Sequence, residues 1–152
     1  MDKRDWGFEE RVWGLEESYD AGRMIPIYLA IKDRNVKSIL DVACGVGLIA
    51  DGLTWMWDDR DIEQFDIIEY PEWRGLKVKP FKKDVMDFIK EDKHYDVVMF
   101  LNSYRNWDKK EQFNEWLKRN ARYFITSGAN LPYKKEIIGK DVKGHNLELY
   151  TI

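Results

Sequence analysis

The sequence predicts a compact, single-domain α/β protein whose mostly parallel sheet carries helices on both faces. Segments with a helical period alternate with segments of strand character along most of the chain, as expected for strands joined by crossover helices. The run Tyr95–Leu101 is apolar almost throughout, as in a strand covered on both faces. At 152 residues the chain is long enough for one domain and too short for two. No repeat or linker divides it, so residues 1–152 are predicted to form one domain.

The composition limits the class of protein and the cellular compartment that fit such a domain. With 44% hydrophobic residues the chain is globular, and a net charge of −3 gives no general electrostatic case for binding nucleic acid. The single cysteine, Cys44, excludes an intrachain disulfide and favours a reducing compartment. No signal peptide and no apolar run of membrane-spanning length is present. A cytoplasmic location without a membrane anchor is therefore predicted.

The N-terminal part, residues 1–33, is predicted to be helical. Apolar residues recur three and four positions apart, which is the spacing of one helix face. They suggest a first helix with Phe8, Val12, Leu15 and Tyr19 inward, and a second with Met24, Ile27, Tyr28 and Ile31 inward. The stretch from Trp6 to Arg23, which includes Tyr19, is the candidate for a lid over a binding site.

The remaining chain alternates strands and helices. The expected strands are Val36–Val42, Ile62–Ile68, Leu76–Phe81, Tyr95–Leu101 and Arg122–Thr126, followed by a hairpin between Glu136 and Ile152 around Lys143-Gly144. Helices are expected over Gly47–Trp57, over Val85–Lys90 with Asp84 as its cap, and after Asp108, which with Glu111 resembles a capping pair. The link Tyr70–Gly75 is too short for a normal crossover helix.

The most informative segment is the glycine-containing turn from Asp41 to Gly47. It ends a strand and opens a helix, and its glycines permit positive φ and a close approach of ligand to backbone. Gly45-x-Gly47-x-x-Ala50, with Asp66 about 20 residues on, satisfies a loose dinucleotide-binding pattern. Asp41 favours a different ligand, because a carboxylate just before the turn suits the ammonium group of a zwitterion.

The stretch Ile39–Gly47 (ILDVACGVG) resembles motif I of the class I S-adenosylmethionine-dependent methyltransferases, whose usual form is close to L-D-x-G-C-G-x-G. Ala43 stands where the first glycine is common. The resemblance continues by order and spacing from Val36 to Thr126. It implies a Rossmann-like fold and S-adenosylmethionine (SAM) as cofactor. Within motif I it implies binding by the residues Asp41, Ala43, Cys44, Gly45 and Gly47.

Weaker motifs follow in the order that this family would have. An acid near the end of the second strand, either Asp66 or Glu69, corresponds to the ribose-binding position. Asp84 and Val85 correspond to the residues that meet the adenine amino group and ring. The segment from Tyr95 to Leu101 and Asn102 looks like motif IV, which places Leu101 beside the cofactor and leads to the substrate side.

Substrate and catalytic residues are less well defined by the sequence. Asn102, Ser103 and Tyr104 follow the fourth strand, where α/β proteins bind ligands, and Tyr133 and Tyr19 are further substrate-binding candidates. The Pro of the Asn/Asp-Pro-Pro-Tyr/Phe signature is absent, which weakens the case for DNA-base methylation. Tyr104 and His145 are the candidate bases, although this family can work without one. His94 and His145 lack metal-ligand spacing, and no metal site is predicted.

The resemblance therefore implies a methyltransferase with an unidentified acceptor, which can be a small molecule, a protein or RNA. Little chain remains after the fifth strand for a last crossover helix, so the site is expected to be open. An open site suits a large substrate or completion by another chain, in a homo-oligomer or with a partner subunit. The alternatives are a non-catalytic methyltransferase-like scaffold subunit and a nicotinamide-dinucleotide-binding module.

Overall fold

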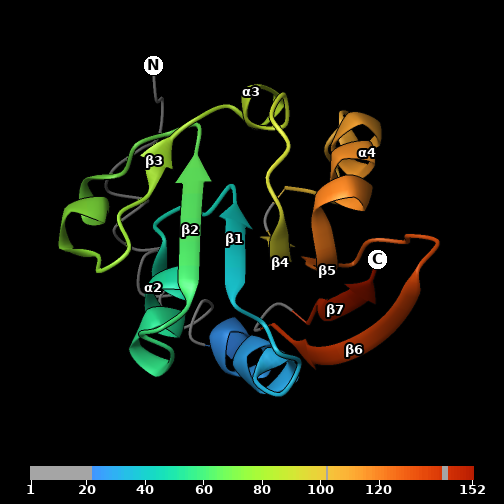
Figure 1. Ribbon diagram of the computed structural model, residues 1–152, viewed down its shortest axis with the longest axis horizontal. Helices are drawn as coiled ribbons and strands as arrows, with labels where there is room; N and C mark the ends of the chain where they lie inside the picture. The colour runs from blue at the N-terminus through green and yellow to red at the C-terminus, as the bar shows by residue number, and fades with distance from the viewer. Residues whose placement is uncertain (1–21, 102, 142–143) are drawn as a thin grey trace.

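The computed structural model describes residues 22–101, 103–141 and 144–152. After a helix over residues 22–31, the elements are β1 (Ser38–Val42), α2 (Leu48–Met56), β2 (Asp61–Asp66), the 3-10 helix η1 (Pro71–Gly75), β3 (Phe81–Lys82), α3 (Val85–Phe88), β4 (Tyr95–Phe100), α4 (Lys110–Asn120), β5 (Ala121–Ser127), β6 (Lys134–Lys140) and β7 (Asn146–Thr151). Figure 1 shows them around one central sheet. The predicted α/β class is confirmed.

The sheet has the strand order β3-β2-β1-β4-β5-β7-β6. Strands β1 to β5 are parallel, whereas β7 is antiparallel to both β5 and β6. Therefore β6 runs in the same direction as β5, and β6 and β7 form the predicted C-terminal hairpin. The inserted antiparallel strand distinguishes this sheet from the 3-2-1-4-5-6 order of dinucleotide-binding domains.

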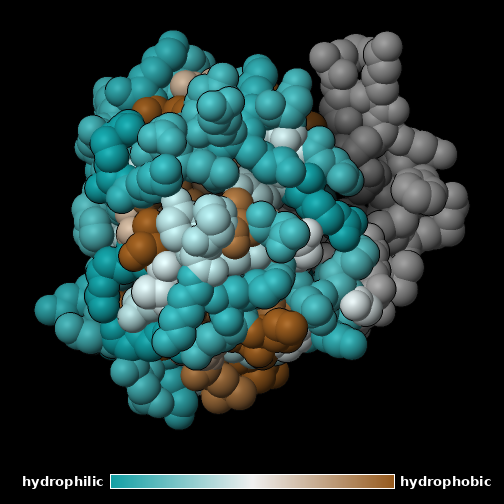
Figure 2. All heavy atoms as spheres, turned by 90° about the vertical axis from the view of Figure 1, so that its right-hand side faces the viewer, coloured by the Kyte–Doolittle hydropathy of each residue, from teal (hydrophilic) through white to brown (hydrophobic). Residues whose placement is uncertain are grey.

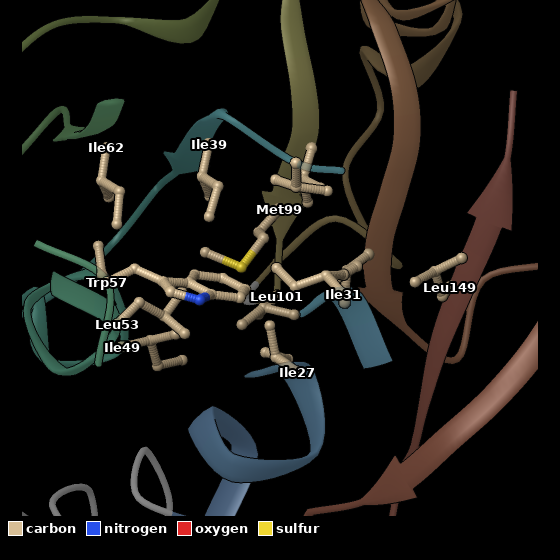
Figure 3. Packing of buried hydrophobic residues seen from close by; sticks show 14 of the residues in the cluster. Ile27, Ile31, Ile39, Ile49, Leu53, Trp57, Ile62, Met99, Leu101 and Leu149 are labelled. Carbon is tan, nitrogen blue, oxygen red and sulfur yellow. The ribbon is translucent and has the colours of Figure 1, made fainter. Parts of the chain in front are cut away.

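One face of the sheet is covered by the helix of residues 22–31 and by α2. Ile27 and Ile31 are fully buried there, as their spacing predicts, and they pack with Leu53 of α2 in the first hydrophobic core. Figure 3 shows these side chains converging on the sheet residues. A Cβ at Gly52 would lie 2.2 Å from Met24 Sδ, so glycine at this position lets the two helices approach closely.

The opposite face carries α3 and α4 over a second, mainly aromatic core. Phe113 of α4 is fully buried, and its ring centroid lies 5.4 Å from that of Phe100 and 5.9 Å from that of Phe124. Trp116 packs against Phe113 in this cluster, and its Nε1 donates a hydrogen bond to the carbonyl of Glu91 at 2.9 Å. Edge-to-face contacts of this kind add to the stabilisation from buried area.

The connection from β5 to β6, residues 128–133, crosses back over this second core without forming a helix. Ala129, Leu131 and Tyr133 pack against the core, and Tyr150 Oη donates a hydrogen bond to the carbonyl of Ala129 at 2.5 Å. The prediction that little room remains for a last crossover helix is confirmed.

Two local predictions are wrong. The third strand was expected over Leu76–Phe81 but comprises only Phe81–Lys82. In the rest of the expected strand, side chains form hydrogen bonds with the backbone groups that would pair with β2. Asp51 accepts from Lys77 N at 2.6 Å, and Gln64 Nε2 donates to the carbonyl of Val78 at 2.8 Å.

The cap of α4 is the second correction. Its N-cap is Lys109, with no side-chain cap bond, rather than Asp108. The chain enters α4 from a turn, so the Asp108–Glu111 pair falls outside the capping position. By contrast, Asp84 caps α3 as predicted and accepts from Met86 N at 2.8 Å.

The outer side of the sheet at β6 carries exposed apolar side chains. Ile25 and Leu29 are 51% and 57% exposed and Ile137 is 59% exposed. They line a groove of about 490 Å³ between the helix of residues 22–31 and β6, hereafter the β6 groove. Figure 2 views the molecule from this side, where hydrophobic areas interrupt a largely hydrophilic surface. In the described part of the chain, no helix has the length and apolar character needed to cross a membrane.

The aromatic core makes a quantitative prediction. Phe113→Ala should lower the free energy of unfolding by about 3–5 kcal/mol, because it leaves a cavity among rings that cannot collapse freely. Urea denaturation measures the change. Gln112→Ala, on the exposed side of the same helix turn, is the matched control and should stay within about 0.5 kcal/mol of wild type. Equal effects of the two substitutions would contradict the assignment of this core.

Candidate functional site

In the bend between β1 and α2, every second residue adopts a left-handed backbone conformation. Ala43, Gly45 and Gly47 have φ values of 54°, 61° and 86°. Left-handed residues turn the chain sharply from the end of β1 into α2 at the carboxyl edge of the sheet, which is the upper edge of β1 in Figure 1. Ala43 adopts this conformation although its side chain disfavours it, which indicates that the surrounding contacts impose the bend.

Three hydrogen bonds fix the bend to the neighbouring segments. Cys44 N donates to the carbonyl of Phe65 at 3.0 Å, and Gly45 N donates to Asp66 Oδ2 at 2.8 Å. On the other side of the same residue, Trp73 Nε1 donates to the carbonyl of Gly45 at 2.9 Å. The bend is thus held by β2 and by η1. Cys44 is buried within it, as a small packed side chain.

The two glycines serve different purposes. A Cβ on Gly47 would lie 2.7 Å from Leu76 Cδ1 and 3.0 Å from Gln64 Nε2, so glycine is needed there for packing. A Cβ on Gly45 would meet no other described atom within 4 Å. Among the described residues, Gly45 therefore borders open space on the side where a Cβ would point.

Two polar side chains lie buried beneath the bend. Asp41 is 3% exposed and Gln64 is fully buried, and the two are register partners on β1 and β2. Gln64 Oε1 has no hydrogen-bond partner among the residues that the structure describes. Sequence reasoning identified Asp41 but missed Gln64, which stands among the polar residues Asp61, Glu63 and Asp66 of the same strand and carries no distinguishing signal. It also missed Trp73.

The acids at the ends of β2 and β3 lie beside the bend. Asp66 is the last residue of β2, and its two oxygens accept from Gly45 N and Ile68 N. Glu69 is exposed and lies beyond the strand, which ends earlier than predicted. Lys83 N donates to the carbonyl of Asp66 at 2.9 Å, which brings the segment with Asp84 next to Asp66.

The segment after β4 leaves the carboxyl edge of the sheet, and the structure describes two of its predicted residues there. Leu101 is buried in the first core, and Ser103 is exposed with a φ of 69°. Asn102, like Tyr19 in the N-terminal segment, lies outside the described residues.

Tyr104 is placed in the second core rather than at an open edge. It is 1% exposed, and its hydroxyl donates to Asn114 Oδ1 at 2.7 Å. Burial raises the pKa of Tyr104 to about 12, and the hydrogen bond with Asn114 opposes this by lowering it. A hydroxyl so placed stays protonated at neutral pH, and the structure gives it a packing role.

The two remaining candidates lie at opposite ends of β6. Tyr133 directly precedes the strand and packs on the second core, whereas His145 lies in the turn after it. Because β6 is parallel to β5, the turn with His145 lies at the carboxyl edge and Tyr133 at the other end. The described residues contain no cluster of three His, Cys, Asp or Glu side chains able to hold a metal ion.

The structure resembles solved methyltransferases. One is the magnesium protoporphyrin IX methyltransferase ChlM from Synechocystis PCC 6803 with bound SAM, at 14% identity and a TM-score of 0.60, with 100% of this chain and 86% of that chain covered. Another is the methyltransferase domain of bacterial CtHen1-CN, at 14% identity and a TM-score of 0.61, with 88% and 100% covered.

A third similar structure is the plantazolicin methyltransferase BpumL with a desmethyl-plantazolicin analogue and S-adenosylhomocysteine (SAH). It has 17% identity and a TM-score of 0.54, and the match covers 72% of this chain but only 47% of that one. No protein-family model matches the sequence, and no curated protein matches it. At these identities the likeness establishes the fold: this chain has the fold of the class I SAM-dependent methyltransferases.

The different surroundings of the two glycines predict different costs of substitution. Gly45→Ala should lower the free energy of unfolding by about 1 kcal/mol, the cost of a left-handed alanine. Gly47→Ala should cost about 1 kcal/mol more, because its Cβ also displaces Leu76 and the buried Gln64 amide. Urea denaturation of both variants measures the difference. Equal losses would show that Gly47 is not a packing position.

The raised pKa of Tyr104 predicts a loss of stability at alkaline pH. Unfolded tyrosine ionises near pH 10 and folded Tyr104 near 12, so its contribution is complete below pH 10 and is lost as the pH rises through 12. Between pH 9 and 11, Tyr104→Phe should lose about 1 kcal/mol less than wild type. Denaturant unfolding at both pH values tests this. Parallel losses in the two proteins would contradict the burial of this hydroxyl.

Proposed function

We propose that the protein is a SAM-dependent methyltransferase that transfers a methyl group to an unidentified acceptor. The observation that carries the proposal is the left-handed bend, open at Gly45 and built directly above the buried Asp41 at the carboxyl edge of the sheet. Ligands of open α/β sheets bind at this edge. The likeness in fold to methyltransferases solved with SAM or SAH supports the same reading.

The residues around the bend fit the amino-acid end of this cofactor. Ala43, Cys44, Gly45 and Gly47 would line it with backbone groups, and Asp41 supplies the negative charge for its ammonium group. Gly45 has the space that a ligand close to the backbone requires. The buried amide of Gln64 lies close to Gly47 and leaves no room for a Cβ at that position.

The acids at the end of β2 and in the segment after β3 fit the nucleoside end of SAM. Asp66 already holds two backbone N–H groups, but a carboxylate has about four acceptor positions, so it can also accept from ribose hydroxyls. We favour Asp66 over Glu69 for this role, because Asp66 is the residue in contact with the bend. Asp84 and Val85 would meet the adenine, with Leu101 closing the cofactor side at β4.

When bound, SAM supplies a methyl group on a sulfonium, whose leaving group is already excellent. The protein then has to align the acceptor with the methyl group and exclude water. Ser103 and Asn102 remain substrate-side proposals, as does Tyr19. The acceptor can be a small molecule, a protein or RNA. The single Cys44 supports a cytoplasmic setting.

A non-catalytic scaffold subunit is the second candidate. Ile25, Leu29 and Ile137 are exposed in the β6 groove, and β6 is an edge strand that pairs only with β7 among the described strands. Both features favour association with another chain. This association can be homo-oligomeric or involve a partner subunit. A scaffold of this kind does not need to bind SAM, which separates it from the enzyme.

Isothermal titration of the full chain with SAM and SAH tests the proposal. Wild type should bind both, and Gly45→Val should weaken binding at least about tenfold, or 1.4 kcal/mol, because its side chain fills the space at the bend. Gly144→Val is the matched control: Gly144 has a φ of +82° and equally open surroundings, but it lies in the β6–β7 turn.

The control should retain wild-type affinity, and circular dichroism should confirm that both variants fold. Absence of SAM and SAH binding to the wild type would favour the scaffold. Binding of NADH instead would favour a dinucleotide-binding module.

A further inference from the structure

The carboxyl edge of the sheet carries a second group of polar side chains, at the end away from β2. Ser127 is the last residue of β5 and is 8% exposed, and its Oγ has no hydrogen-bond partner within the described ranges. Its register partner on β7 is Leu147, which follows His145 by two residues. A buried hydroxyl without a partner is costly and commonly marks the position of a bound polar group.

His145 is held in the turn that precedes β7 by a buried carboxylate that sequence reasoning did not identify. The side chain of Asp141 is completely buried, and Asp141 Oδ1 accepts from His145 N at 2.9 Å. Asp141 N donates back to the carbonyl of His145 at 3.0 Å. The imidazole Nδ1 lies 3.5 Å from Asp141 Oδ2, while the ring is 38% exposed. This arrangement directs Nδ1 to the carboxylate and leaves Nε2 for another partner.

Alternation along the strands places Ser127 and Leu147 on the same side of the sheet as Asp41. Asp41 on β1 lies between the second-core residues Leu40 and Val42, so it faces the first core. Ser127 lies two residues after Ile125 of the first core, and Leu147 of β7 also belongs to that core. Adjacent strands are about 4.8 Å apart, so Ser127 lies roughly 10 Å and the start of β7 roughly 14 Å along the edge from β1.

We propose that His145 is a catalytic base, that Asp141 is its positioning residue, and that Ser127 binds the acceptor, which is a neutral hydroxyl or amine. The inference rests on the proposed methyltransferase function and specifies its substrate class. As the acceptor oxygen or nitrogen bonds to the methyl carbon, the carbon–sulfur bond breaks and its electrons stay on sulfur. The acceptor proton moves to Nε2 of His145, and the imidazolium is stabilised by Asp141 before it returns the proton to water.

This chemistry explains why the acceptor class is limited. A hydroxyl or a neutral amine becomes positively charged on methylation unless its proton is removed, so a base near the attacking atom lowers the barrier. A thiolate or a carbanion needs no such base. The orphan Ser127 Oγ is suited to orient the acceptor heteroatom, because a hydroxyl can both donate and accept.

Nuclear magnetic resonance of the full chain with 15N-labelled histidine tests the pair independently of activity. The only other histidine, His94, serves as the internal reference. Neutral His145 should carry its proton on Nδ1, and Asp141→Asn should move that proton to Nε2, while the signals of His94 stay unchanged. The saturating addition of SAH should shift the Nε2 resonance of His145 but not that of His94. A wild-type proton on Nε2, or no response to bound SAH, overturns the inference.

Methyl transfer supplies the second readout, with tritiated SAM as donor and p-cresol and butylamine as acceptor probes. Wild type should methylate at least one probe, and His145→Ala should slow transfer by about 100-fold while calorimetry shows unchanged SAM affinity. Transfer to neither probe, or an unaffected rate in His145→Ala, contradicts the assigned role and acceptor class. Loss of SAM binding in wild type would instead be a failure of the proposed function, and calorimetry distinguishes the two.

Discussion

The hydrogen bond from Gly45 N to the carboxylate of Asp66 is the contact on which the geometry of the site depends. One carboxylate joins the bend after β1 to the chain leaving β2, because its second oxygen holds Ile68 N. A charged acceptor makes such bonds stronger than neutral ones. The left-handed conformation of Ala43 costs free energy, and this anchor helps to offset that cost.

The connections around this bend are unusually short, and the cores compensate for them. Between β2 and β3 a 3-10 helix replaces a crossover helix, yet Trp73 from that short element reaches the carbonyl of Gly45. After β5, residues 128–133 replace a second helix, and aromatic side chains close the face that a helix would cover. Tyr150 fixes this crossover through the carbonyl of Ala129.

The sequence predicted those features that depend on local periodicity or on short-range turn chemistry. Helix α2, strands β1 and β4, the cap Asp84 and the bend at Gly45 and Gly47 belong to this group. It failed where distant side chains compete for the backbone, as Asp51 does for Lys77 in the expected third strand. Gln64, Trp73 and Asp141 escaped notice for the same reason: each acquires its role from a contact made in the folded state. Tyr104 was misjudged because position after a strand does not reveal which face a side chain enters.

The direction of β6 links the crossover to the second polar group of the site. A tight hairpin after β5 would make β6 antiparallel to β5 and carry the β6–β7 turn to the opposite edge. Residues 128–133 instead return along the sheet from the end of β5 to the start of β6, and an extended segment of this length can span roughly 25 Å. Because of this return, β6 is parallel to β5, and Asp141 and His145 reach the same edge as Asp41 and Gly45. The connection without a helix between β5 and β6 thus allows one site to include residues from both halves of the sheet.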